Sequence, residues 1–316
     1  MPAANLLTLL DDISTVLDDV AVLSKVAAKK TAGVLGDDLA LNAEQVSGVK
    51  AERELPVVFA VAKGSLLNKL ILVPSALLIS YFIPWLVTYL LIAGGLYLCF
   101  EGIEKLLHKF MSSKEELKQL HQHKLAALAD PNVNMVEIEK AKIKGAIITD
   151  FVLSAEIIVI ILGTVQSQPF STQIAVLSLM SIAFTIGVYG IVAMIVKIDD
   201  LGLYLVRRAV SDGGRSIKRM LGNMLLRFAP ILMKLLSIVG TAAMFLVGGG
   251  IIAHDIPVLH HFVENSIELV SVFPSLNNII SSLTGILMNG FVGIVSGLMA
   301  YVFYVGVHKL FLTKSS

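Results

Sequence analysis

The chain alternates long apolar windows with shorter charged segments. Five windows of 19 or more residues are strongly apolar: 70–100, 145–163, 174–196, 235–253 and 279–307. Four of them carry no charged residue, and the window 145–163 contains only Asp150 and Glu156. A helix needs about 20 apolar residues to cross roughly 30 Å of hydrocarbon. Each of the last four windows is therefore predicted to form one transmembrane helix.

The first window, 70–100, allows more than one arrangement. Pro84 divides it into pieces of 14 and 16 residues, and each piece is short for a full crossing. The window could form two short helices in a hairpin, a re-entrant hairpin, or one long tilted span.

The distribution of basic residues selects the hairpin. If both ends of the window lie on one side, all 25 Lys and Arg fall on that side, and the opposite loops, 164–173 and 254–278, contain none. Lys and Arg concentrate on the cytoplasmic side of membrane proteins. We therefore expect both termini in the cytoplasm, with six crossings or with four crossings and a re-entrant hairpin.

These segments predict a polytopic all-α membrane protein with cytoplasmic helical elements. The expected organisation is acidic, amphipathic N-terminal helices in 1–65, a membrane hairpin in 66–100, a cytoplasmic helical hairpin in 101–144, a four-span bundle in 145–307 with a basic cytoplasmic loop at 197–230, and a tail at 308–316.

Composition supports the membrane assignment. Hydrophobic residues make up 56% of the chain and charged residues 16%, with a mean hydropathy of +0.81. Soluble domains carry roughly 25% charged residues, so a soluble enzyme is excluded. A net charge of +1 excludes a generally basic nucleic-acid-binding protein. The lone cysteine, Cys99, excludes disulfide frameworks and multi-cysteine metal sites.

Several runs resemble a known family. They are LLTLLDDISTVLDDVAVLSKVAAKKTAGVLGDDLALN, VFAVAKGS, HKF, TDFVLSAEIIVIILGTV and KIDDLGLYL. Together they are similar to the bacterial inner-membrane family typified by the YedI protein, a family of unknown function. The resemblance spans nearly the whole chain. It implies a multi-pass protein of the inner membrane of a Gram-negative-type bacterium, and it supplies no substrate, cofactor or functional residue.

Two acidic residues in one span are the main candidate site. An ionisable side chain inside a bilayer costs at least about 2.5 kcal/mol, which makes it a functional hypothesis by default. Glu156 lies near the middle of its window and Asp150 about five residues from its start. Six positions at about 100° each place them on different flanks of a helix. The alternative is a structural carboxylate bonded to another helix. Lys234 could be the partner, although Lys234 and Lys69 are expected to extend to the interface.

Three successive glycines form a second candidate. Gly248, Gly249 and Gly250 could unwind their helix, and discontinuous helices hold ions in many transporters. The alternative is that small residues allow two helices to pack closely.

Two groups are weaker candidates for metal ligands. Glu101, Glu104 and His108 share one helical face, and Asp199 and Asp200 form a double aspartate. Carboxylates can bind a hard divalent cation, and a face with histidine can bind a transition metal if another helix contributes ligands. Solvation, helix capping and ion pairing are the alternative roles.

The leading functional hypothesis is a transporter or channel for a small solute or ion. Glu156 would be the principal residue, with Asp150 and Gly248–Gly250 as supports. The alternative is a scaffold or regulatory protein whose acidic N-terminal helices bind a cytoplasmic partner. We expect no cofactor and no enzymatic activity, since no nucleophile elbow, phosphate-binding loop or zinc-protease motif is present; an intramembrane enzyme acting on lipid is the remaining alternative. The expected partners are the lipid bilayer and the solute, not nucleic acid, and self-association stays open.

Overall fold

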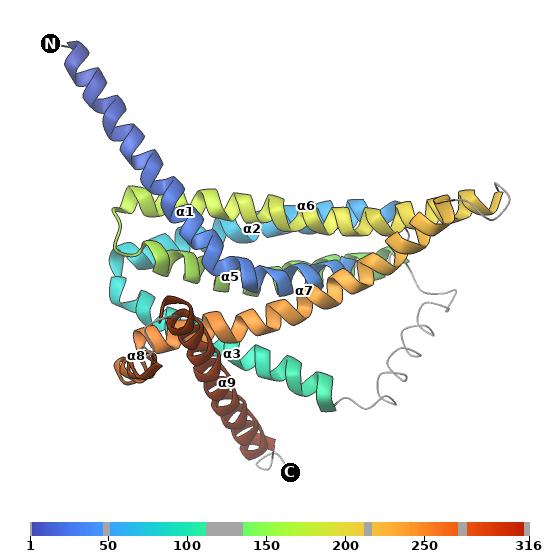
Figure 1. Ribbon diagram of the computed structural model, residues 1–316. Helices are drawn as coiled ribbons and strands as arrows, with labels where there is room; N and C mark the ends of the chain where they lie inside the picture. The colour runs from blue at the N-terminus through green and yellow to red at the C-terminus, as the bar shows by residue number, and fades with distance from the viewer. Residues whose placement is uncertain (1, 47–50, 112–134, 212–216, 271–276, 313–316) are drawn as a thin grey trace. The chain divides into compact units, whose positions relative to one another are not determined.

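The computed structural model describes residues 2–46, 51–111, 135–211, 217–270 and 277–312. This part of the chain is helical and holds no strand (Figure 1). The helices are α1 (Pro2–Val46), α2 (Ala51–Phe82), α3 (Pro84–Met111), α5 (Met135–Val165), α6 (Phe170–Ser211), α7 (Ile217–Asp255), α8 (Pro257–Val270) and α9 (Asn277–Leu312).

Six of these helices are long and apolar enough to cross a membrane, which confirms the predicted polytopic all-α class. Their candidate spans are Arg53–Phe82, Pro84–His108, Glu139–Val165, Phe170–Ala209, Ile217–Asp255 and Leu283–His308.

The first membrane hairpin consists of two long helices. α2 has 32 residues and α3 has 28, or about 48 and 42 Å at 1.5 Å per residue. They are longer than the pieces of the charge-free window because each continues into a charged flank. The chain leaves the helical conformation at Ile83, directly before Pro84, which disfavours helix in the preceding residue and is well placed to begin the next one.

The turn between α2 and α3 lies at the same end as the turn between α5 and α6. Gln166 Nε2 donates to the Pro84 carbonyl oxygen at 3.0 Å, and the Ser80 hydroxyl donates to Gln173 Oε1 at 2.6 Å. Because α5 is a candidate full span, α2 beside it reaches the same depth. This arrangement favours six crossings over a re-entrant hairpin.

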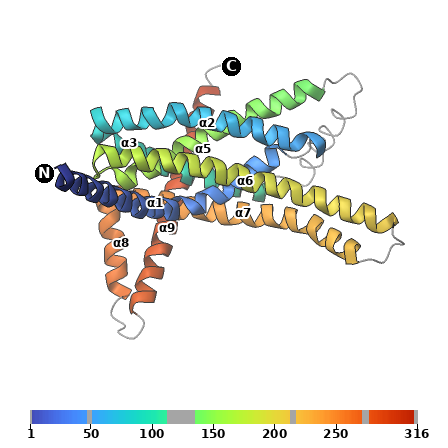
Figure 2. The same cartoon turned by 90° about the horizontal axis from the view of Figure 1, so that it is seen from above.

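The chain divides into two compact units. Unit 1 comprises residues 1–91 and 142–240, and unit 2 comprises residues 92–141 and 241–316. In unit 1, α6 packs against both α1 and α2 (Figures 1 and 2). Its core includes Val46, Val58, Val61, Val192 and Val196.

One continuous helix forms most of the predicted N-terminal region. Residues 13–19 of α1 are exposed, whereas Ala27, Val34 and Ala43 are almost completely buried in unit 1. α1 meets α7 at Gly240, where an added Cβ would lie 2.7 Å from the Asp37 Cα. The acidic pair Asp37–Asp38 therefore lies inside the bundle, not at a helix end.

The predicted basic loop at 197–230 is also largely helical. α6 continues to Ser211 and α7 begins at Ile217, so most of this segment is helical. Gly202 and Gly222 let the two extensions approach, since a Cβ on Gly222 would lie 2.8 Å from the Gly202 carbonyl oxygen. Of the predicted cytoplasmic hairpin at 101–144, residues 112–134 lie outside the described residues, as do residues 313–316 of the predicted tail.

Glycines hold unit 2 together. A Cβ on Gly248 would lie 2.7 Å from the Gly95 carbonyl oxygen of α3, and one on Gly249 would lie 2.6 Å from the Gly293 nitrogen of α9. Gly297 of α9 contacts the Cys99 backbone in the same way. α7 is unbroken through Gly248–Gly250, so an unwound ion-binding segment is wrong here. Gly248 and Gly249 instead allow α7 to pack closely against α3 and α9, which is the alternative role.

Candidate functional site

Asp150 is the centre of a buried polar cluster in unit 1. Its carboxylate accepts hydrogen bonds from Ser65 Oγ at 2.9 Å, Asn68 Nδ2 at 3.0 Å, Tyr189 OH at 2.8 Å and Ser154 Oγ at 3.3 Å. The side chains come from α2, α5 and α6, and Asp150 is only 5% exposed. An ionised carboxylate has about four acceptor sites and no donor. Four donors around it therefore match the charged form of Asp150.

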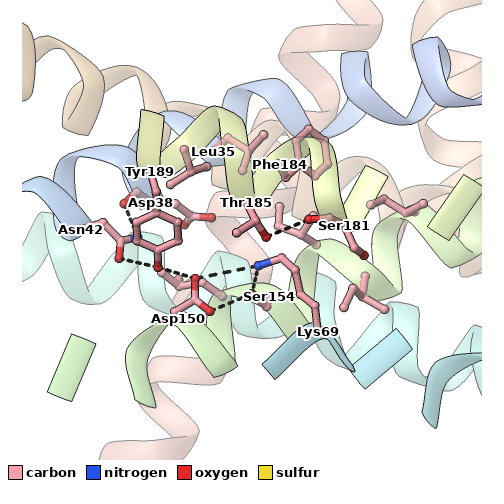
Figure 3. Close-up of a pocket in the computed structure, with 15 residues that line it drawn as sticks. Leu35, Asp38, Asn42, Lys69, Asp150, Ser154, Ser181, Phe184, Thr185 and Tyr189 are labelled. Carbon is pink, nitrogen blue, oxygen red and sulfur yellow. Dashed lines mark hydrogen bonds and ion pairs between the residues drawn. The ribbon is translucent and has the colours of Figure 1, made fainter. Parts of the chain in front are cut away.

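Lys69 is the basic partner of this carboxylate. Its Nζ donates to Ser65 Oγ at 2.8 Å and to Ser154 Oγ at 2.9 Å, and it lies 4.0 Å from Asp150 Oδ1. Both hydroxyls accept from the ammonium and donate to the carboxylate, so they bridge the two charges. Figure 3 shows the bridge through Ser154. The prediction that Lys69 extends to the interface is wrong, because this side chain is buried and bonded. Lys234, the partner considered from the sequence, is exposed and does not line the cavity beside this cluster.

Tyr189 connects the cluster to α1. Its hydroxyl lies 3.3 Å from Asn42 Oδ1, besides donating to Asp150. The amide nitrogen of Asn42 donates to the Asp38 carbonyl oxygen at 2.8 Å, one turn earlier in the same helix. α1 thus contributes polar groups to a site that otherwise lies among candidate spans.

A small cavity lies beside the cluster. It has a volume of about 30 Å³, enough for about two water molecules. Its polar lining consists of Asp38, Asn42, Lys69, Asp150, Ser154, Ser181, Thr185 and Tyr189 (Figure 3). The site can therefore hold waters or one dehydrated ion, but not a sugar or an amino acid in this conformation.

The part of the lining that α5 contributes is polar at one end and apolar at the other. Along α5 its lining changes from Asp150 and Ser154 to Ile157, Ile158 and Ile161. Toward the start of α5 the polar groups continue, because Gln45 Nε2 donates to Thr149 Oγ1 at 3.1 Å. Along α5 the apolar side chains lie between Asp150 and the end at which the α5–α6 turn lies, and α6 adds Ser181 and Thr185 to the lining.

Glu156 does not line the cavity. It is buried, at 8% exposure, but the residues of α5 that line the cavity are 150, 153, 154, 157, 158 and 161. These positions recur at steps of three and four and form one face of the helix. Asp150, predicted as a supporting residue, lines the cavity, whereas Glu156 lies off this face.

The weaker metal candidates are not brought together. Glu101 pairs with Lys105 at 2.7 Å, and Asp200 pairs with Lys197 at 2.5 Å. Glu104 and His108 are exposed, and the side chain of Asp199 lies outside the described residues. Within the described part of the chain, no group of three or more His, Cys, Asp and Glu side chains is placed to hold a metal ion.

Sequence reasoning missed most members of the cluster. Ser65 and Lys69 are four residues apart in α2, as are Asp150 and Ser154 in α5 and Asp38 and Asn42 in α1. Polar residues at helical spacing on buried faces were the available signal. Their convergence on one another depends on how the helices pack.

Comparison with known proteins gives one match. A family model described as a protein of unknown function, DUF808, matches residues 4–303. No curated protein and no solved structure matches the chain. The matched segment contains every residue of the Asp150 cluster and covers nearly the whole chain. The expectation of a family of unknown function is confirmed, and the chain belongs to the DUF808 family.

Proposed function

We propose that this protein transports a small ion across the bacterial inner membrane through unit 1, with Asp150 as the ion-binding residue. The observation that carries the proposal is the buried Asp150–Lys69 pair beside a cavity lined by α1, α2, α5 and α6. Ionisable residues in membrane spans pair with one another and mark ion pathways and proton relays.

The energetic cost of the cluster supports a functional role. A buried ion pair is often no more stable than well-packed apolar residues of similar volume. The fold could therefore be held without Asp150 and Lys69, as the apolar core of unit 2 around Cys99 and Ile252 illustrates. A costly polar cluster at a cavity is better explained by an ion than by stability.

The size of the cavity limits the solute. A volume of about 30 Å³ accommodates water, which can carry a proton, or a dehydrated ion. Larger solutes would need a different conformation. We therefore favour an ion over the broader class of small solutes, and we propose no enzymatic activity.

The helices and the charges support an orientation with both termini in the cytoplasm. Six crossings put both termini on one side, and the turn at 166–169 between α5 and α6 carries no Lys or Arg. Basic residues such as Lys144, Lys197 and Arg207 lie toward the opposite ends of these helices. By the positive-inside rule, both termini would be cytoplasmic.

Ion flux into proteoliposomes tests the proposal. Wild type should move protons or a monovalent cation down an imposed gradient, and Asp150→Asn should fall to the rate of protein-free liposomes. Glu156→Gln is the matched control, because it removes the same charge from the same helix away from the cavity. No flux by folded wild type, or full flux by folded Asp150→Asn, would reject the proposal.

One observation supports the second candidate function, a scaffold or regulatory protein. On the exposed part of α1, Ile13, Leu17 and Val22 are 47%, 62% and 62% exposed, next to exposed Asp18 and Asp19. Deleting residues 1–50 would not test it cleanly, because Leu35, Asp38 and Asn42 line the cavity. The sharper test is Leu17→Ser with Val22→Ser, which should abolish capture of a defined cytoplasmic partner that Asp150→Asn still binds.

A further inference from the structure

The hydrogen bonds around Asp150 determine which ions it can take up. Its Oδ1 accepts from Ser65 and Tyr189, and its Oδ2 accepts from Asn68 and Ser154. An ionised carboxylate has about four acceptor sites, so these donors occupy them. A metal cation would have to displace some of the donors before it could bind. A proton need not, because it can move along a hydrogen bond that already exists.

Two of these donors connect the carboxylate to Lys69. Lys69 Nζ donates to Ser65 Oγ at 2.8 Å, and Ser65 Oγ donates to Asp150 Oδ1 at 2.9 Å. A second path runs through Ser154 Oγ, which lies 2.9 Å from Nζ and 3.3 Å from Asp150 Oδ2. In each path the serine hydroxyl accepts from the ammonium and donates to the carboxylate. Each path is therefore a complete chain of hydrogen bonds from a proton donor to a proton acceptor.

A proton can cross either path while the same atoms stay hydrogen bonded. In the Ser65 path, an Nζ–H bond breaks as a new Oγ–H bond forms, and the original Oγ–H bond breaks as an Oδ1–H bond forms. Lys69 becomes a neutral amine, and Asp150 becomes a neutral carboxylic acid that donates back to Ser65. The cost of desolvating two buried charges opposes their mutual attraction, which brings the ionised and neutral states of the pair closer in energy.

The cavity gives the Lys69 end of these paths access to water. An ammonium has three donors, and the two serines use two of them. Lys69 lines the cavity, whose volume of about 30 Å³ admits water. Ser181 lines it too; it is only 5% exposed, and its hydroxyl has no hydrogen-bond partner among the described residues. A buried hydroxyl requires a partner, and water in the cavity would supply one.

We propose that the transported ion is a proton and that the hydroxyls of Ser65 and Ser154 carry it between Lys69 and Asp150. After the transfer, a hydronium ion in the cavity gives a proton to the Lys69 amine. Asp150 then releases its proton to water toward the start of α5, where polar side chains continue. One proton enters and one leaves, so the pair returns to its ionised state. The inference rests on the proposed function and names its substrate.

Proton uptake by proteoliposomes that hold the full chain tests the relay. A K⁺ gradient with valinomycin supplies the membrane potential, and a trapped pH-sensitive dye reports the uptake. Wild type is compared with Ser65→Ala, with Ser154→Ala and with both changes together. A variant with Ser65→Thr and Ser154→Thr keeps both hydroxyls. Ser75→Ala is the matched control, because it removes an exposed hydroxyl from the same helix as Ser65.

We expect Ser75→Ala and the double threonine variant to take up protons as wild type does. The double alanine variant should be slower by about a hundredfold, or fall to the leak of protein-free liposomes, because both paths are interrupted. Ser65→Ala should lose more flux than Ser154→Ala, because the path that it leaves contains the longer hydrogen bond, 3.3 Å.

The rates in H₂O and D₂O separate proton transfer from packing. In Ser65→Ala the remaining flux should show a larger ratio of the rate in H₂O to the rate in D₂O than wild type does, because transfer through the remaining path becomes limiting. A packing defect would lower the flux without raising this ratio. The midpoint of thermal unfolding in detergent shows that each variant is folded.

Three results would overturn the inference and leave transport standing. One is full proton flux by the folded double alanine variant. Another is uptake of radiolabelled Na⁺ or Rb⁺ by wild type, measured without valinomycin, in the absence of proton flux. The third applies even if the double alanine variant does not fold, and it is an unchanged H₂O-to-D₂O ratio in Ser65→Ala. No flux of any ion by folded wild type would instead overturn both this inference and the proposed function.

Discussion

At the scale of single residues, Asp150 and Lys69 form a pair whose members are linked mainly through other groups. Their closest atoms are 4.0 Å apart, while both are hydrogen bonded to Ser65 and Ser154. Each charge therefore depends on the other for electrostatic balance and on the hydroxyls for its hydrogen bonds. Removing one charge should leave the other buried without compensation.

This arrangement predicts a non-additive double mutant. Asp150→Asn and Lys69→Met should each lower the free energy of unfolding, by up to about 3–5 kcal/mol when a buried partner charge is left uncompensated. The double variant should lose less than the sum, by about 0.5–3 kcal/mol. Thermal or denaturant unfolding in detergent measures this coupling. Additivity within about 0.5 kcal/mol would show that the charges do not interact.

Residue-level prediction from the sequence succeeded only in part. Asp150 was identifiable because a carboxylate in an apolar window is costly. Lys69 was not, because a lysine at the edge of such a window normally reaches the interface. Whether it instead turns inward depends on Ser154 of another helix, and no local pattern contains that information.

At the scale of helices, close approach through glycine is the main feature of unit 2. α7 meets α3 at Gly248 and Gly95, and meets α9 at Gly249 and Gly293. The contacts are with backbone atoms, which cannot rotate away as a flexible side chain would. Small residues give membrane helices the short separations from which their packing energy comes.

Gly249→Ala should therefore destabilise the fold. The added Cβ would lie 2.6 Å from the Gly293 nitrogen, so α7 and α9 must separate, and overpacking of this kind costs about 1–3 kcal/mol. Gly187→Ala is the control, because nothing lies within 4 Å of its added Cβ. Alanine favours helix by up to about 1 kcal/mol, so this control should be neutral or stabilising. Equal melting temperatures for the two variants would contradict the α7–α9 contact.

The sequence indicated the helices more reliably than their packing. Apolar windows identified the spans because the bilayer requires a minimum length of apolar helix. The second half of α1 was predicted to belong to the acidic cytoplasmic region 1–65. Its burial becomes evident only when α6 and the middle of α7 are placed beside it. The continuity of α7 through three glycines likewise depends on the neighbours that fill the space around them.

At the scale of the whole molecule, the orientation of unit 1 in the membrane determines from which side the proposed ion would reach the cavity. The polar α5 residues of the lining lie toward the start of that helix, and its apolar α5 residues lie toward the α5–α6 turn. If both termini are cytoplasmic, the polar groups that continue from Asp150 toward the start of α5 would lie on the cytoplasmic side of the cavity. The side chains of Ile157, Ile158 and Ile161 would then limit access from the periplasm.

The topology can be tested with single cysteines, because Cys99 is the chain's only cysteine and is buried. In a Cys99→Ser background, Ile83→Cys and Gln168→Cys should react with a membrane-impermeant thiol reagent added to intact spheroplasts. Both positions lie in turns at one end of unit 1, tied together by the bond from Gln166 to Pro84. Lys63→Cys and Lys144→Cys, toward the basic ends of α2 and α5, should react only after permeabilisation.

Two labelling results would contradict this topology. Labelling at residue 168 but not at residue 83 would favour a re-entrant hairpin. Labelling of residues 63 and 144 in intact spheroplasts would reverse the orientation, and the apolar side of the cavity would then face the cytoplasm.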